Sequence, residues 1–167
     1  TPETKDVLSE ESAYVTLKLL EGVTEAGSGI RLRHVGADKT NPIFKDIVTG
    51  YPYAFKNPIA GKTGTTQNQS DGWFIGMVPN LATGVWVGGE DRATHFETIA
   101  YGQGATMALP IWASYMNACY ADSTIVISQE PFEAPSLVSI PLNCDSLSLS
   151  RQQKSFFNDE DLSDLGF

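Results

Sequence analysis

The residues best suited to chemistry lie in the run Ala-Gly-Lys-Thr-Gly-Thr-Thr at positions 60–66. Lys62 supplies a positive charge that can assist proton transfer, and the threonines supply hydroxyls that can hydrogen-bond a carboxylate. Gly64 lets a ligand backbone approach the chain closely. The run therefore predicts a site that binds an anionic, extended ligand.

Part of this run also matches the end of a phosphate-binding loop, Gly61-Lys62-Thr63. That loop needs a glycine at position 56, where this chain has a lysine, and it must open a helix. An apolar stretch that suits a strand follows instead, so nucleotide binding is not predicted. A Gly/Thr-rich edge strand with a solvated lysine remains the alternative without chemistry.

Two helices are predicted around the run. Ser9 is a favoured N-cap for a helix over residues 10–25. Its apolar residues at helical spacing predict a buried stripe of Ala13, Leu17, Leu20 and Val23. The second helix is predicted over residues 105–120, with Pro110 in its first turns and a stripe of Leu109, Trp112, Met116 and Cys119. Gly102-Gln103-Gly104 is interpreted as the turn that starts this helix, with a place at the border of the site as the alternative.

Three strands are predicted at residues 59–66, 72–78 and 83–88. The four-residue link at 79–82 indicates a hairpin between the last two, and the short link before them favours an antiparallel meander. Phe74 is predicted to lie in the core. Residues 30–58 are predicted to have little regular structure, with Arg31 and Arg33 as solvated charges. The fold class is therefore α+β, an antiparallel sheet with packed helices.

Composition limits the domain organisation and the classes of partner. The chain has 167 residues and a net charge of −9, which argues against nucleic acid as a partner. Residues 121–167 carry 8 acidic and 2 basic residues, so we predict a core at 1–120 and a weakly folded acidic extension at 121–167. No apolar run approaches a membrane span. The polar start at Thr1 predicts that the chain is a piece of a longer one.

Metal and disulfide sites have little support in the sequence. Its two histidines, His34 and His95, are 61 residues apart and have no nearby Cys or His, so no metal is predicted. Cys119 and Cys144 could form one bridge or remain two free thiols.

Five blocks together resemble the class A penicillin-binding proteins. They occur in that family's order within residues 9–120. The blocks are Leu-Leu-Glu-Gly-Val-Thr-Glu-Ala-Gly-Ser-Gly (19–29), Asn-Pro-Ile-Ala-Gly-Lys-Thr-Gly-Thr-Thr (57–66), Asp-Gly-Trp-Phe-Ile-Gly (71–76), Gly-Val-Trp-Val-Gly (84–88) and Ala-Leu-Pro-Ile-Trp (108–112).

This resemblance implies the C-terminal part of a serine D,D-transpeptidase domain in a membrane-anchored enzyme of peptidoglycan synthesis, with a glycosyltransferase region upstream. Lys62 and Thr63 are implied as catalytic residues beside the nucleophile, and Gly64, Thr65 and Thr66 as substrate-binding residues. Thr65 would bind the substrate carboxylate and supply an oxyanion N–H. The implied partners are stem peptides ending in D-Ala-D-Ala, β-lactams and the missing upstream part. The implied place is the periplasmic face of the cytoplasmic membrane, and no cofactor is implied.

The chain departs from the family's pattern in one large respect. The family uses Ser-x-x-Lys and Ser-x-Asn ahead of Lys-Thr-Gly, and neither occurs here. We therefore expect this chain to hold the substrate-binding strand without the nucleophile, and to be inactive alone. Strands that complete the sheet in the family are also expected to be absent. The alternatives are a non-catalytic penicillin- or peptide-sensing module, a β-lactamase, and a structural cell-surface module.

Overall fold

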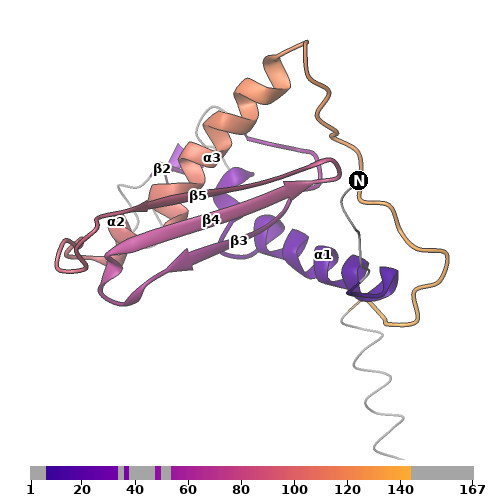
Figure 1. The fold of residues 1–167 in the computed structure, drawn as a ribbon, viewed down its shortest axis with the longest axis horizontal. Coiled ribbons are helices and arrows are strands. Elements are labelled where there is room, and N and C mark those ends of the chain that lie inside the picture. Colours follow the sequence, from indigo (N-terminus) through magenta and orange to yellow (C-terminus); the bar gives the residue numbers. More distant parts are fainter. Residues whose placement is uncertain (1–6, 34–35, 38–47, 50–53, 144–167) are drawn as a thin grey trace, which may run out of the picture. The chain divides into compact units, whose positions relative to one another are not determined.

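A computed structural model describes residues 7–33, 36–37, 48–49 and 54–143 of the chain. The chain divides into two compact units. The larger is Thr16–Glu133, and the smaller combines Thr1–Val15 with Ala134–Phe167. The sheet and the helices packed on it, which Figure 1 labels, and the whole run at 60–66 lie within residues 16–133 and so belong to the larger unit.

The centre of the larger unit is an antiparallel sheet in the order β3-β4-β5. The strands are β3 (Ala60–Thr65), β4 (Asp71–Val78) and β5 (Leu81–Gly88). They lie within two residues of the predicted ranges, so the predicted meander is confirmed. Burial alternates along β4, because one face of the strand lies on the core and the other does not. With helices on this sheet, the predicted α+β class is confirmed.

The link between β4 and β5 is shorter than predicted. Val78 pairs with Leu81 and Met77 pairs with Ala82, so only Pro79 and Asn80 join the two strands. The predicted four-residue link was wrong because Leu81 and Ala82 continue the ladder instead of leaving it. A two-residue connection is a common hairpin form.

The helix α3 (Gly104–Ala121) follows the one-turn helix α2 (Ile99–Gly102) and packs on the sheet (Figure 1). Its predicted stripe is buried as expected. The Trp112 ring meets the buried Phe74 ring edge to face at 5.2 Å between centroids, and its Nε1 donates to Thr83 Oγ1 at 2.6 Å. Gly76 permits this approach, since a Cβ there would lie 2.4 Å from the indole.

The helix α1 (Glu10–Glu25) has the predicted bounds, and Ser9 caps it by accepting a hydrogen bond from Ser12 N at 3.1 Å. The predicted burial of its apolar stripe was wrong. Those four residues are only half-buried, whereas the buried residues of α1 are Glu21 and Thr24. Glu21 is paired with Lys18, and Thr24 donates to the backbone ahead of β3. The buried face of α1 is therefore the one whose polar side chains find partners, and the spacing of apolar residues does not reveal it.

The stretch 30–58 has more order than predicted where it is described. It contains the short 3₁₀ helix η1 (Ile30–Leu32) and two paired two-residue strands, β1 (Gly36–Ala37) and β2 (Val48–Thr49). Leu32 is completely buried and belongs to the core cluster. His34 lies outside the described residues.

Residues 122–143 form no helix or strand, but side chains hold them at two places. In the larger unit, Asn80 Nδ2 donates to Val126 O at 2.7 Å and Asn80 Oδ1 accepts from Ser128 N at 2.8 Å. In the smaller unit, Glu11 Oε1 accepts hydrogen bonds from Ser139 N, Ser139 Oγ and Ile140 N. The predicted domain boundary after residue 120 stays a prediction.

Two other expectations concern features of the whole chain. Cys119 is buried and forms no disulfide with any described residue; Cys144 lies outside the described residues, so the pairing of the two stays untested. Within the described ranges, no helix has both the length and the apolar character needed to cross a bilayer.

Candidate active site on the edge strand

The Lys-Thr-Gly residues lie on β3, which pairs only with β4 in the described part of the chain. Thr63 lies opposite Phe74, and Lys62 lies opposite Ile75. Because directly paired residues share a face of an antiparallel sheet, Thr63 and Thr65 lie on the face of the buried Phe74, and Lys62 lies on the other. An extended ligand along the outer edge of β3 would therefore pass between the ammonium and the two hydroxyls.

Lys62 is exposed and turns back onto its own strand. Its Nζ donates to Thr63 O at 2.8 Å. An ammonium has three N–H donors, so this contact leaves donors for a group that approaches the edge. The charge of Lys62 thus sits beside the Thr63 peptide.

The Thr63 hydroxyl has a partner from a distant part of the sequence. Ser28 Oγ lies 2.6 Å from Thr63 Oγ1, across a separation of 35 residues. Ser28 belongs to the tight turn that ends α1, where Gly29 N donates to Val23 O at 2.9 Å. This turn needs its glycines, because a Cβ on Gly27 would lie 2.9 Å from the Val23 Cα.

The Thr65 hydroxyl is held by the start of α3. Gly104 N donates to Thr65 Oγ1 at 3.0 Å. The helix can come this close because position 104 has no side chain: a Cβ there would lie 2.3 Å from both Gly64 O and Trp73 O. The two interpretations of Gly102-Gln103-Gly104 are therefore compatible, since the turn that starts the helix also contacts the Lys-Thr-Gly strand.

The Thr66 hydroxyl is used within the loop from β3 to β4. It donates to Asp71 O at 3.2 Å, accepts from Asp71 N at 3.0 Å and lies 3.0 Å from Ser70 Oγ. In the same loop Asn68 and Gln69 have positive φ angles of 64° and 51°. Residues other than glycine rarely adopt this backbone conformation. Thr66 thus shapes the loop beside the strand.

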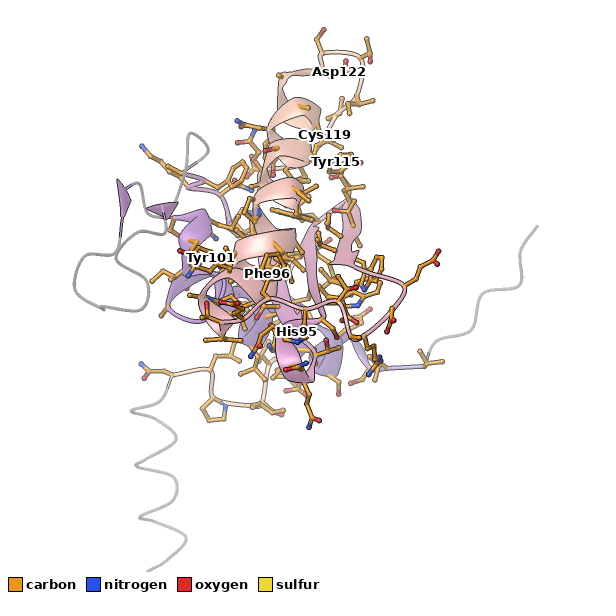
Figure 2. All side chains as sticks on the ribbon, turned by 90° about the vertical axis from the view of Figure 1, so that its left-hand side faces the viewer. His95, Phe96, Tyr101, Tyr115, Cys119 and Asp122 are labelled. Atoms are coloured by element: carbon orange, nitrogen blue, oxygen red, sulfur yellow. The ribbon has the colours of Figure 1, made fainter. Side chains whose placement is uncertain are left out.

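A hollow of about 360 Å³ lies next to this loop. Its lining is mostly apolar and includes His95 and Phe96, which Figure 2 labels together with Tyr101 on the adjoining helix α2. Phe96 N donates to Gln69 O at 3.4 Å, and this bond ties the segment to the β3–β4 loop. The other lining residues are Ser70, Val87, Gly88, Gly89, Thr94 and Met107.

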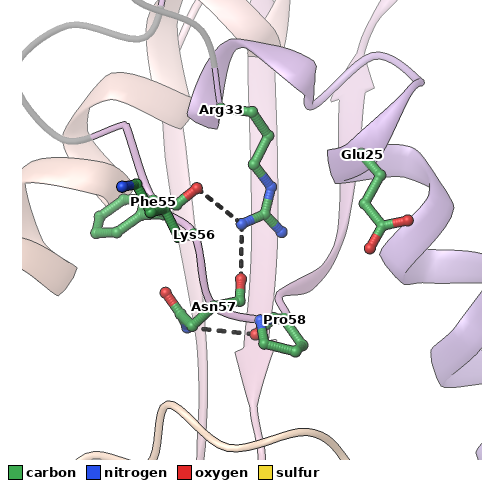
Figure 3. A pocket seen from close by; sticks show the side chains of 6 residues that line it. All are labelled: Glu25, Arg33, Phe55, Lys56, Asn57 and Pro58. Atoms are coloured by element: carbon green, nitrogen blue, oxygen red, sulfur yellow. Dashed lines mark hydrogen bonds between the residues drawn. The ribbon is translucent and has the colours of Figure 1, made fainter.

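Arg31 and Arg33 make hydrogen bonds to other groups of the protein, so the expectation of solvated charges was wrong. Arg31 is 9% exposed, and its Nη1 donates to Thr106 Oγ1 at 2.6 Å, which fixes the start of α3. Arg33 Nη1 donates to Phe55 O at 3.0 Å and Asn57 O at 2.6 Å in the hollow of Figure 3. Burial lowers the pKa of Arg33.

The anchor around Arg33 sets the entry into β3. Thr24 Oγ1 donates to Ile59 O at 2.6 Å and accepts from Arg33 Nη2 at 3.1 Å. The end of α1 is thereby bonded to the residue that immediately precedes the strand. The hollow in Figure 3 also has Glu25, Lys56 and Pro58 in its lining.

No group of three histidine, cysteine, aspartate or glutamate side chains suited to a metal ion occurs among the described residues. Of the five sequence-predicted site residues, Lys62, Thr63, Gly64 and Thr65 lie together on β3, and Thr66 begins the loop. Sequence reasoning missed the contacts of Ser28 and Gly104. The signal was present as single glycines around Ser28 and at 104, but without the fold these marked only turns.

Comparison with known proteins gives relatives of one kind. The chain is 30% identical over 138 residues to penicillin-binding protein 1A of Pseudomonas aeruginosa, which covers 82% of this chain and 14% of the relative. It is 40% identical over 77 residues to penicillin-binding protein 1A of Aquifex aeolicus, covering 46% of this chain and 10% of the relative. Penicillin-binding protein 1B of Buchnera aphidicola is 32% identical over 115 residues, covering 69% and 12%.

The chain belongs to the class A penicillin-binding protein family. No family model matches the chain. The chain spans between 10% and 14% of the length of these three relatives. The candidate active site of this chain is the edge strand β3 with Lys62, Thr63 and Thr65.

Proposed function

We propose that this chain forms the substrate-binding side of a serine D,D-transpeptidase site that cross-links peptidoglycan stem peptides. The observation that carries the proposal is the pair of threonine hydroxyls on one face of an edge strand, with Lys62 on the other face and its ammonium at the Thr63 carbonyl. Hydroxyl and ammonium donors suit a terminal carboxylate, such as that of D-alanine or of a penicillin. The free edge of β3 suits an extended peptide.

In this proposal, Thr63 and Thr65 hold the carboxylate and the Thr65 N–H contributes to an oxyanion hole. A serine oxygen attacks the carbonyl of the penultimate D-Ala, the bond to the terminal D-Ala breaks, and the serine proton passes to the leaving amine. The nitrogen of an acceptor amine then attacks the ester carbonyl, the bond from this carbonyl to the serine oxygen breaks, and a proton of the amine passes to that oxygen. Lys62 lies beside the nucleophile and supports proton transfer, while Gly64 lets the substrate backbone approach.

The serine itself comes from elsewhere in the protein in this proposal. This sequence contains no Ser-x-x-Lys and no Ser-x-Asn, and it spans a small share of its relatives. We therefore place the nucleophile on another segment of the full-length protein. We place the domain outside the cytoplasmic membrane, with glycosyltransferase activity and the anchor on further segments. The contacts of Thr66 favour a role in shaping the loop next to Thr65.

Intact-mass spectrometry after incubation with a penicillin tests this function. We expect a penicilloyl adduct on the full-length protein and none on the 167-residue chain alone. The Lys62→Ala variant should lose the adduct, whereas Lys56→Ala, an exposed lysine ahead of the strand, should keep it. A full-length protein without any adduct would contradict the proposal, and rapid release of the penicilloyl group would favour a β-lactamase.

A further inference from the structure

Ser28 occupies a position that its own turn does not explain. The turn after α1 is closed by backbone bonds, Gly29 N to Val23 O at 2.9 Å and Ile30 N to Gly27 O at 3.1 Å. Neither bond uses the Ser28 side chain. That side chain is exposed and its Oγ lies 2.6 Å from Thr63 Oγ1. The hydroxyl therefore serves the strand and not the turn.

Counting donors shows what such a contact does. A threonine hydroxyl has one proton and two lone pairs. When a neighbour donates to the oxygen, the proton stays free for another acceptor. Gly104 N does this for Thr65, because an amide can only donate. If Ser28 donates to Thr63 in the same way, both hydroxyls present their protons to one anionic group.

We propose that Ser28 is a positioning residue of the site, whose hydroxyl donates to Thr63 so that the Thr63 proton is directed to the ligand carboxylate. The proposal rests on the proposed function. The energetic basis is that the Thr63 hydroxyl is held in one orientation and does not rotate freely. Less conformational freedom is therefore lost when the ligand binds. The turn is suited to hold the serine in place, because two backbone hydrogen bonds close it and Gly27 and Gly29 pack closely against the end of α1.

The location of Ser28 makes a clean test possible. Its side chain is exposed, so Ser28→Ala leaves no buried polar group of its own without a partner. We expect the melting temperature to be unchanged. Ser28→Thr keeps the hydroxyl and is the conservative rescue.

The experiment measures the second-order rate constant of acylation of the full-length protein by a penicillin and by its methyl ester. Ser28→Ala should lower the rate with the free acid by roughly 3- to 10-fold, the range of one ordinary hydrogen bond, and leave the rate with the ester unchanged. Ser28→Thr should restore the preference for the acid. In a Thr63→Val background, Ser28→Ala should have no further effect, because the residue acts through Thr63.

Ser123→Ala is the matched control, since Ser123 is an exposed serine after the end of α3, and it should behave as wild type. Equal losses with acid and ester, or an undiminished loss in the Thr63→Val background, would overturn the role of Ser28. A wild-type protein that is not acylated by either compound would overturn the proposed function itself. A wild-type protein that is acylated, with an unchanged preference in Ser28→Ala, would overturn this inference alone.

Discussion

The hydroxyls on β3 are each held by one short contact from outside the strand. Thr63 is held by a side chain and Thr65 by a backbone amide. A backbone amide cannot be removed by ordinary substitution. Its position can be disturbed, however, by adding a side chain to a glycine that packs closely. Gly104 is therefore the residue at which the packing of α3 on the strand can be tested.

Gly104→Ala should lower the free energy of unfolding by about 1–3 kcal/mol, the usual cost of forcing extra volume into a packed site. The added Cβ would lie 2.3 Å from two backbone oxygens that cannot move independently of the sheet. Urea denaturation measures the loss. Gly22→Ala is the matched control: a Cβ there meets nothing within 4 Å, so a gain of roughly 0.5–1 kcal/mol is expected from helix propensity. Equal effects at the two glycines would contradict the close packing at Gly104.

Thr24→Val should cost about 1–3 kcal/mol of stability although the two side chains have nearly the same shape. The buried Thr24 hydroxyl donates to Ile59 O and accepts from Arg33, so valine leaves both partners without it. Thermal denaturation would show the loss. Thr24→Ser keeps the hydroxyl and should retain more stability than Thr24→Val; the reverse order would exclude the hydrogen bonds as the cause.

Elements with a strong local pattern were predictable, and those decided by polar contacts were not. The bounds of α1 follow from its N-cap and periodicity, and the buried stripe of α3 follows from apolar residues at helical spacing. The buried face of α1 depends on Thr24 reaching Ile59, 35 residues away, which no local spacing encodes. The burial of Arg31 has the same origin, since its partner Thr106 lies 75 residues further along the sequence, on α3.

The same distinction applies to the candidate site. The Lys-Thr-Gly run is contiguous, so its residues could be selected from the sequence together. Their partners Ser28 and Gly104 meet β3 only after α1 and α3 have packed around it. Sequence reasoning can therefore find the strand, but the residues that orient its side chains require the fold.

One side chain of the β4–β5 hairpin bonds to the backbone of residues 126–128, where Ile127 also packs against the core. Asn80 makes two hydrogen bonds to the backbone at Val126 and Ser128. Asn80→Ala should speed hydrogen exchange of the Ser128 amide by about 3- to 10-fold, as expected for an exposed segment that loses a single ordinary hydrogen bond. The amides of α3 should not change. Unaltered exchange at Ser128 would show that packing, and not Asn80, holds the segment.

A second attachment, in the smaller unit, is expected to depend on pH. Hydrogen bonds from the side chain and the backbone of Ser139 lower the pKa of Glu11 below 4.5. Because the folded-state pKa is lowered, the contact stabilises fully above the ordinary glutamate pKa and is lost as the pH falls through the lowered value. The amide chemical shifts of Ser139 and Ile140 should therefore titrate below pH 4.5. Glu11→Gln should abolish this titration, and a midpoint above 4.5 would contradict the assignment.

At the scale of the whole molecule, the sheet face opposite α3 carries large apolar residues. Trp73, Ile75 and Trp86 are 45%, 47% and 45% exposed, and Trp73 lies directly opposite Trp86. Contiguous apolar surface of this kind marks a contact surface or an aggregation hazard. In the full-length protein we expect further segments to cover it.

The 167-residue chain alone should accordingly self-associate as its concentration rises. Ile75→Lys should shift the sedimentation profile towards the monomer, because a second lysine beside Lys62, which pairs with position 75, opposes burial of this face. Ile111→Lys is the control, since Ile111 is 51% exposed on α3 and lies away from that face. Association that both variants weaken equally, or that neither weakens, would exclude this face as the cause.

The edge of β3 that has no partner strand among the described residues also has a thermodynamic consequence. A peptide that binds there in extended form would act as one more strand, so the ligand would supply backbone hydrogen bonds at an edge that pairs with no other strand in the described part of the chain. Ligand binding would then stabilise the folded state. The melting temperature of the protein would rise with the logarithm of the ligand concentration once the site is saturated. Under the proposed function, a stem peptide bound at this edge would in this way raise the stability of the domain.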